Sequence, residues 1–426
     1  MGRTVMVFAA GSRGDVQPFL SLGRALARRG DVVRLLASTR YRHLVTTAGL
    51  EFQPLAADPA DIIASVEGQE LLAGRNNPVS FIRGMSRILG PRIRSVLDQT
   101  RAAAEGADLI LAPSFGFVGL HLSQYLRVPH VVVHFQPSQP TGKFPHPFTP
   151  AARLFGPLGN RLSYDIIDLG TWLAFRESIN AWRRESLDLP ALPPRATLVE
   201  ARRAPVLCAF SPTIVPPPPD WGPNVHVTGF WHHEQPLWNP PHRLRSFLDN
   251  GPAPVYVGFG SMKTADPLAT DRIVRAALRR AGLRGVLAGD PATSEDDMLV
   301  VDDTPHDWLF PQMAAVVHHG GAGTTASALR AGVPSLVCPF FGDQIFWGTR
   351  IHRLRAGPAP LPTARLTVPV LTRRLIALTS NTTHIDVTRR LGSTLRAENG
   401  AVHARRVLDT ITEVASDRDR RDMRPY

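Results

Sequence analysis

Residues 316–344, VVHHGGAGTTASALRAGVPSLVCPFFGDQ, decide the fold of this chain. The stretch begins as an apolar strand, passes two histidines, His318 and His319, and enters a turn with three glycines in four positions. A helix of small residues follows, with two threonines near its start. Glycine lets backbone N–H groups approach a ligand, and the first turn of a helix offers unpaired donors and a positive dipole end. The pattern therefore predicts an anion site of the kind that holds phosphate.

A second turn, from Pro339 to Gln344, follows the next apolar strand. Turns after parallel strands lie at the same edge of a sheet, so Asp343 and Gln344 are expected near the histidine turn. A carboxylate beside an amide suits the paired hydroxyls of a sugar. The alternative is an ordinary βαβ unit with a glycine turn and a surface Asp-Gln; the length of the whole run favours the ligand site.

The run from strand to Asp-Gln resembles the donor-binding signature of nucleotide-sugar glycosyltransferases of the UDP-glycosyltransferase superfamily, which have the GT-B fold. It resembles in particular the sterol glucosyltransferases and the bacterial enzymes that glycosylate glycopeptide, macrolide and other natural products. The resemblance implies an α/β chain with two Rossmann-like doubly wound domains facing across a cleft. Its expected parts are an acceptor-binding domain at 1–215, a proline-rich linker at 216–240, a donor-binding domain at 241–397, and a crossover helix with a charged tail at 398–426.

Length and composition agree with a soluble two-domain protein. A chain of 426 residues, 43% apolar and 20% charged, can form two domains of about 200 residues each. Cys208 and Cys338 lie in apolar runs, which predicts buried thiols in a reducing compartment. No signal sequence and no apolar run of about 18 residues is visible, so we expect a cytoplasmic protein without a transmembrane segment.

The net charge of +12 is almost entirely arginine, since lysine occurs only at Lys143 and Lys263. A nucleic-acid-binding protein usually gathers such charge on one face, whereas here arginine is scattered over many expected helices. Most of it is interpreted as solvated helix surface, and nucleic acid is not an expected partner. Part of it can attract an anionic donor, or a membrane surface if the acceptor is a lipid.

The first loop, Gly11-Ser-Arg-Gly-Asp15-Val-Gln-Pro18, follows an apolar strand at 4–10. It lacks Gly-x-Gly-x-x-Gly, and no acidic residue ends the second strand, so a nicotinamide dinucleotide site is weakly supported. The loop matches the first loop of the sterol and glycopeptide branch of the resembled family. That resemblance makes Asp15 the general base and Ser12 a donor contact. Alternatively, Asp15 caps a helix that begins at Val16 or Pro18, and both roles are compatible.

Donor contacts beyond this loop also come from the resemblance. The phosphate groups would be bound by Ser261, after the strand 254–259, and by the histidine turn. The stretch 304–312 would hold the nucleoside base, but its Trp-x-x-Pro-Gln is one residue longer than the plant Trp-x-Pro-Gln. Which residue stacks on the base therefore stays open, and a buried structural Trp308 is the competing interpretation. The expected donor contacts are Ser12, Ser261, Trp308, Leu309, His319, Gly321, Gly323, Thr324, Asp343 and Gln344.

Acceptor contacts are expected in the long loop 135–149, which is rich in Pro, Phe and His and follows a strand at 131–134. In the resembled enzymes this region borders the acceptor site, and an aromatic loop suits an apolar aglycone. The expected acceptor contacts are His134, Phe135, Phe144, His146 and Phe148. Two segments with helical patterns flank this region, at 80–104 and 151–188.

The resemblance implies a metal-independent, inverting hexosyltransferase that needs no cofactor beyond its nucleotide-sugar co-substrate. It would move a hexose from a UDP- or dTDP-sugar to a hydroxyl of a polyketide, glycopeptide, aromatic compound or sterol. Asp15 would take the acceptor proton, and His319 with the backbone amides would stabilise the leaving diphosphate. His318 is expected to face the core. The alternatives are a sugar-nucleotide epimerase or hydrolase of the same fold, and a non-catalytic partner of another glycosyltransferase.

Overall fold

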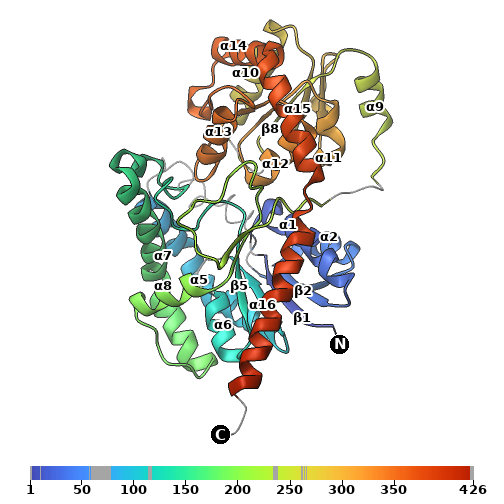
Figure 1. Cartoon of the computed structure of the whole chain (residues 1–426). Helices are drawn as coiled ribbons and strands as arrows, with labels where there is room; N and C mark the ends of the chain where they lie inside the picture. Colours follow the sequence, from blue (N-terminus) through green and yellow to red (C-terminus); the bar gives the residue numbers. More distant parts are fainter. Residues whose placement is uncertain are drawn as a thin grey trace. The chain divides into compact units, whose positions relative to one another are not determined.

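The computed structural model describes residues 2–9, 11–56, 58, 78–113, 118–233, 238–260, 262, 264 and 266–422. The chain forms two compact units (Figure 1). The first unit contains Met1–His233 together with Asn399–Tyr426, and the second unit is Glu234–Glu398. Each is built around its own parallel sheet with helices on both faces, which confirms the predicted α/β class.

The first unit contains a seven-stranded sheet in the order β3-β2-β1-β4-β5-β6-β7. Neighbouring strands pair in parallel throughout the described ladder. The strands are β1 (Thr4–Phe8), β2 (Val32–Ser38), β3 (Glu51–Leu55), β4 (Leu109–Ala112), β5 (His130–His134), β6 (Val206–Cys208) and β7 (Val225–Val227). This order is that of a doubly wound sheet, and it places the loops after β1 and β4 beside each other, at the point where the strand order reverses.

Helices cover both faces of this sheet because successive strand residues point to opposite sides. Val5 and Val7 of β1 join one core with α1, α2 and α16, while Met6 and Phe8 join the other with α5, α6 and α7. The helices of the first unit are α1 (Arg13–Ala27), α2 (Arg42–Thr47), α5 (Pro78–Ala104), α6 (Val118–Leu126), α7 (Gly156–Ser186), α8 (Pro194–Arg203) and α16 (Gly400–Asp422). Short 3-10 helices lie at η1 (Thr39–Tyr41) and η3 (Pro150–Phe155).

The second unit has a five-stranded parallel sheet in the order β10-β9-β8-β11-β12. Its strands are β8 (Val255–Gly258), β9 (Gly285–Ala288), β10 (Met298–Val301), β11 (Ala315–His318) and β12 (Ser335–Val337). Its helices are α9 (His242–Asp249), α10 (Pro267–Arg280), α11 (His306–Leu309), α12 (Ala322–Ala331), α13 (Gln344–Arg353), α14 (Val368–Ser380) and α15 (Thr382–Ala397). Its 3-10 helices are η4 (Pro291–Thr293), η5 (Phe310–Gln312) and η6 (Thr363–Arg365).

Helix α16 returns to the first unit and lies beside α1 (Figure 1). Ala401, Ala404 and Leu408 are buried in the core that α1 shares with the sheet. Near the end of the helix, Asp409 Oδ1 lies 2.7 Å from the Arg3 guanidinium, which also pairs with Asp31. The last described helix is therefore an integral part of the first unit.

The range predicted to be a linker, 216–240, differs from that expectation in its first half. Residues 225–227 form β7, which pairs with β6 as the seventh strand of the sheet. The prolines at 216–219 lie between these strands, where no ladder hydrogen bond is lost. Asp220 accepts hydrogen bonds from Thr141 Oγ1 at 2.7 Å and from the Gly142 N–H at 2.8 Å. Proline density here marks a loop fixed to the sheet.

Both cysteines are buried and unpaired, as predicted. None of the helices in the described ranges combines the length and apolarity that a membrane crossing demands.

Candidate functional site

The glycine turn of the second unit connects β11 to α12. Gly320 has a φ of +97°, and a Cβ at this position would lie 2.6 Å from Val337 Cγ1 and 3.0 Å from the Gln344 carbonyl oxygen. Both the backbone conformation and the space therefore require glycine. The same distances show that the Gly320 turn and the turn ending at Gln344 touch, as the sheet-edge argument predicted.

His318 is fully buried, as expected. Its Nδ1 accepts a hydrogen bond from the Gly320 N–H at 3.1 Å, which fixes the start of the turn. Burial, with smaller contributions from His319 and His306, lowers the pKa of His318 well below its usual value. The imidazole is therefore neutral at physiological pH and serves the structure of the turn.

His319 packs between two glycines. A Cβ on Gly260 would lie 3.1 Å from its Cε1, and a Cβ on Gly321 would lie 2.5 Å from its Nε2. Burial lowers the pKa of His319 to about 4. Its Nδ1 is buried and has no hydrogen-bond partner within the described part of the chain. A neutral ring with an unsatisfied nitrogen, held by glycines, can donate to or accept from a ligand, and an anion beside it would raise its pKa.

The start of α12 supplies the backbone donors of the predicted anion site. Gly321 is the N-cap, and the first hydrogen bond within the helix runs from the Thr325 N–H to the Gly321 oxygen at 2.9 Å. The N–H groups of the residues between them belong to the first turn, where α-helices leave donors unpaired. Gly323 is exposed, and a Cβ there would meet nothing within 4 Å. Thr324 is half-buried in the same turn.

The two polar side chains at the second turn are both engaged in holding it. Gln344 is buried, and its Oε1 accepts from the Phe340 N–H at 2.7 Å and the Phe341 N–H at 3.3 Å. Asp343 Oδ2 accepts from Trp347 Nε1 at 3.0 Å, and the Trp347 ring is fully buried. These bonds orient Asp343 and Gln344, so any sugar contact would use the remaining atoms of each group.

The stretch predicted to hold the base folds into α11 and η5. Trp308 is half-buried and packs against Trp238, with ring centroids 5.0 Å apart. The side chain of Leu309 is fully buried in the core, so only its backbone could reach a ligand. Ser261, the expected phosphate contact after β8, lies outside the described residues.

In the first unit, α1 begins at Arg13 and not at Val16 or Pro18 as the capping alternative assumed. Asp15 is therefore the third residue of the helix, and its Oδ2 accepts from the N-cap Ser12 through both the N–H, at 2.7 Å, and Oγ, at 3.0 Å. A Cβ on Gly11 would collide with this carboxylate, so the preceding glycine makes room for it. Burial raises the pKa of Asp15, and the two Ser12 bonds oppose that shift. Asp15 thus closes the helix start, and it has the raised pKa that suits a general base.

The residues predicted to contact the acceptor divide into two groups. His134, at the end of β5, is buried, and burial lowers its pKa to about 4. Phe135 points to the opposite face, where its ring packs 5.2 Å from Phe19 and 6.1 Å from Trp231. The alternation of a strand separates these two neighbours.

The rest of the acceptor loop folds onto α7. His146 is buried, its N–H donates to Ser163 Oγ at 2.8 Å, and its Nδ1 accepts from the Phe148 N–H at 3.2 Å. The Tyr164 hydroxyl donates to the Phe144 carbonyl at 3.3 Å. The structure therefore groups Phe144, His146 and Phe148 at the start of α7 and places Phe135 apart from them.

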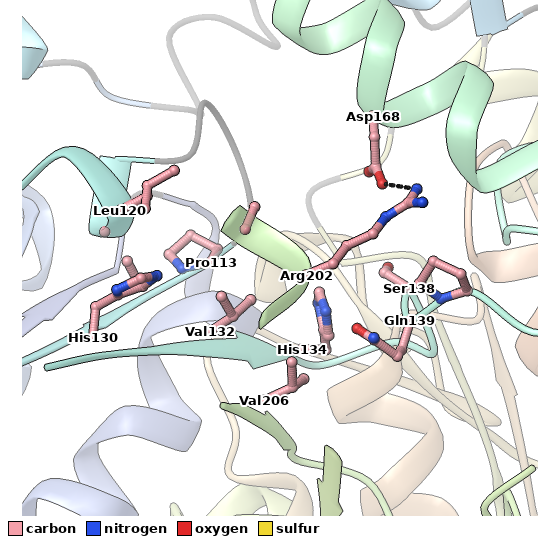
Figure 2. A pocket seen from close by; sticks show the side chains of 14 residues that line it. Pro113, Leu120, His130, Val132, His134, Ser138, Gln139, Asp168, Arg202 and Val206 are labelled. Atoms are coloured by element: carbon pink, nitrogen blue, oxygen red, sulfur yellow. Dashed lines mark hydrogen bonds and ion pairs between the residues drawn. The ribbon is translucent and has the colours of Figure 1, made fainter. Parts of the chain in front are cut away.

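A cavity of about 40 Å³ lies between the sheet and helices α6, α7 and α8 (Figure 2). His130, Val132 and His134 of β5 point into it, and Gln139, Asp168 and Arg202 also line it. Arg202 Nη2 lies 3.0 Å from Asp168 Oδ2, and burial raises the pKa of Asp168. The volume admits a few water molecules or one polar group, not a whole aglycone.

Sequence reasoning identified only His134 among the polar residues that line this cavity. His130 could have been found from its spacing, because residues 130 and 134 of one strand point to the same face of the sheet.

Two family models match separate parts of the chain. Residues 5–106 match the glycosyltransferase family 28 N-terminal domain, and residues 290–404 match the erythromycin biosynthesis protein CIII-like C-terminal domain. The chain is 36% identical over 375 residues to a sterol 3-beta-glucosyltransferase of Arabidopsis thaliana, covering 84% of this chain and 58% of that protein. Both matched segments are thus similar to glycosyltransferase families.

Two further comparisons extend this similarity. It is 33% identical over 410 residues to a sterol 3-beta-glucosyltransferase of Aspergillus oryzae, covering 92% of this chain and 29% of that protein. The solved structure of the Streptomyces sp. SF2575 glycosyltransferase SsfS6 complexed with thymidine diphosphate has a TM-score of 0.61 and 18% identity, and covers 96% of this chain and 99% of that one. The chain spans less than two thirds of the length of these curated relatives.

Proposed function

We propose that this chain transfers a hexose from a nucleoside-diphosphate sugar to the hydroxyl of a sterol or similar apolar aglycone, with inversion at the anomeric carbon. The observation that supports this best is the phosphate-type turn of the second unit. There a half-buried histidine, whose buried Nδ1 is unsatisfied, packs against Gly260 and Gly321 at the start of an α-helix. The sterol-type acceptor is supported by the similarity to two sterol 3-beta-glucosyltransferases.

In this proposal the acceptor oxygen attacks the anomeric carbon, while the bond from that carbon to the diphosphate oxygen breaks. Asp15 Oδ1 or Oδ2 takes the hydroxyl proton, and its raised pKa makes it a better base than an exposed carboxylate. The two bonds from Ser12 hold the carboxylate in place for this step. Ser12 would thus position the base in addition to its predicted donor contact.

The leaving diphosphate gains negative charge as this bond breaks. His319 and the amides of the first turn of α12 would stabilise that charge, because preorganised donors in a site with little water act strongly. We propose that these groups suffice without a metal ion. Asp343 and Gln344, held by Trp347 and the Phe340 turn, would orient the sugar hydroxyls.

The direct test incubates purified protein with UDP-glucose or dTDP-glucose and a cyclodextrin-solubilised sterol. A β-glucoside identified by NMR, and lost in Asp15→Asn, supports the proposal. Free glucose or an epimerised donor, formed at the same rate with and without acceptor, would establish the hydrolase or epimerase alternative. Absence of turnover with every donor, while nucleotide still binds, would favour a non-catalytic partner.

A further inference from the structure

Helix α7 exposes a row of large apolar side chains. Leu158, Leu162, Ile166, Leu169 and Leu173 follow one another at intervals of three or four residues, and each is between 38% and 70% exposed. Such spacing places them on one face of the helix, over a length of roughly 22 Å at 1.5 Å per residue. We call this row, together with the exposed Leu154 and Phe155 of η3, the α7 stripe.

The opposite side of α7 is a conventional core face. Trp172, Phe175, Ile179 and Trp182 are buried there against α5 and the sheet. Gly170 packs against Ile82 of α5, and Trp182 Nε1 donates to Asp98 Oδ1 at 3.0 Å. The α7 stripe is therefore not needed to attach the helix. Folded proteins rarely expose so many contiguous large apolar side chains unless the surface binds something.

The charges near the stripe favour an anionic partner. Exposed arginines stand along η3 and α7 at Arg153, Arg161 and Arg176, of which Arg161 pairs with Asp220 at 3.0 Å. The acidic residues Asp165 and Asp168 of α7 are paired with Arg202 at 2.6 and 3.0 Å. The whole chain carries a net charge of +12. A helix with an apolar face and nearby cations is the usual form of an interfacial membrane helix.

The stripe also adjoins the proposed acceptor loop. Its first residues lie in η3, which directly follows residues 141–149, and Asn160 Nδ2 donates to the Gly142 carbonyl at 2.9 Å. Together with the His146 and Tyr164 bonds, this attaches the loop to the first turns of α7. A surface that docks on a bilayer here would bring the acceptor loop to the boundary where sterols reside.

We propose that the α7 stripe docks on the headgroup–acyl boundary of an anionic lipid bilayer, so that a sterol can enter the acceptor loop directly from the membrane. The route for the sterol rests on the proposed function, whereas bilayer binding does not. Leucine and isoleucine side chains would enter the boundary while the arginines contact lipid phosphates.

The experiment uses the full chain and sucrose-loaded vesicles of phosphatidylcholine alone or with phosphatidylserine, at low and high salt. The stripe variant is Leu162→Ser with Ile166→Ser and Leu169→Ser. The matched control is Leu268→Ser with Ile376→Ser and Val414→Ser, three exposed apolar side chains on other helices. We expect wild type and control to sediment with the anionic vesicles and less so in high salt, and the stripe variant to lose at least about tenfold in partitioning.

Equal sedimentation of the stripe variant and the control would overturn the proposal, as would failure of the wild type to bind either vesicle. Sedimentation velocity tests the competing occupant: a wild-type dimer that the stripe variant dissociates would assign the surface to a second copy of the chain. Both variants change exposed sites, so circular dichroism should show unchanged folding.

Glycosylation assays separate this proposal from the proposed function. The stripe variant should lose rate with sterol in vesicles and keep it with sterol in cyclodextrin. If no sterol is glycosylated in either form while vesicle binding follows the stripe, the membrane surface stands and the sterol function fails.

Discussion

Replacement of Gly323 by alanine separates the needs of the fold from those of the ligand. Gly323 is the second residue of α12, it is exposed, and an added Cβ would have open space around it. Glycine in a helix is less stable than alanine by up to about 1 kcal/mol. The variant should therefore be as stable as wild type or more so, with a melting temperature higher by up to about 2–4 °C.

Nucleotide binding should change in the opposite direction. A phosphate oxygen that accepts from the Gly323 N–H at about 2.9 Å would lie against the new methyl group. Crowding by one methyl group costs roughly 1–3 kcal/mol. That cost corresponds to a loss of about 5- to 150-fold in affinity for UDP or dTDP. A variant that is more stable and yet binds nucleotide more weakly has no structural explanation other than a ligand at this turn.

Calorimetry supplies both measurements, with titration for nucleotide affinity and scanning for stability. Gly90→Ala is the control for nucleotide binding, because Gly90 lies within α5 and an added Cβ would meet open space apart from its chain neighbours. Gly90 precedes Pro91, whose ring disfavours helical backbone at a residue with a Cβ, so this variant should not gain stability, and its nucleotide affinity should stay unchanged. If Gly323→Ala gains stability and binds nucleotide as wild type does, the start of α12 is not the phosphate site.

Four further predictions follow from the same geometry. Asp15→Asn keeps an oxygen for the Ser12 bonds, so it should fold and bind nucleotide normally while turnover falls by roughly 10²–10⁴-fold; wild-type turnover would leave Asp15 as a helix cap only. His319→Ala should weaken donor use in kinetic assays without loss of stability. His318→Ala should lower the free energy of unfolding by roughly 1–3 kcal/mol in thermal melts, because it removes a buried ring and the acceptor of the Gly320 hydrogen bond. The reverse pattern would exchange the roles of the two histidines. Several histidines have lowered pKa values, among them His134 and His319 at about 4, and remain neutral in the fold while the unfolded chain binds protons below about pH 6.5. The free energy of unfolding should therefore fall between about pH 6.5 and 4, and a urea midpoint that is equal at both ends of this range would contradict that. EDTA should leave the transfer rate unchanged, and activity abolished by EDTA and restored by magnesium would show that His319 and the helix amides do not suffice.

The second unit was largely predictable because its information is local. Apolar runs with glycines directly after them indicated β11, α12 and β12 in order, and the rule for parallel strands correctly brought the Gly320 and Gln344 turns together. The side-chain partners were not predictable in this way. The sequence did not indicate that the Gln344 oxygen accepts from the backbone of its own turn, and its predicted sugar contact stays a prediction. It also did not indicate that the Leu309 side chain faces the core, which leaves only the backbone for the predicted donor contact.

Features of the first unit that depend on distant segments were harder to predict. His134 and Arg202 line one cavity although β5 and α8 are separated by the whole of α7. The start of α1 at Arg13 was not visible either, because Gly14 reads as part of a loop. Proline density suggested a linker where the chain forms β7. Prolines lack the N–H donors that a strand needs, but they do not exclude a strand in the residues that follow them.

The return of α16 to the first unit has a consequence for biosynthesis. The second unit is an insertion between residues 233 and 399 of the first, so a ribosome completes its sequence before that of the first unit. Until Ala401, Ala404 and Leu408 emerge, the face of α1 that they cover is open to water and to other chains. The core of the nascent first unit therefore stays incomplete until α16 is synthesised, whereas the second unit can fold as an uninterrupted segment. A chaperone that shields α1 during this interval would act on a state that the finished molecule never shows.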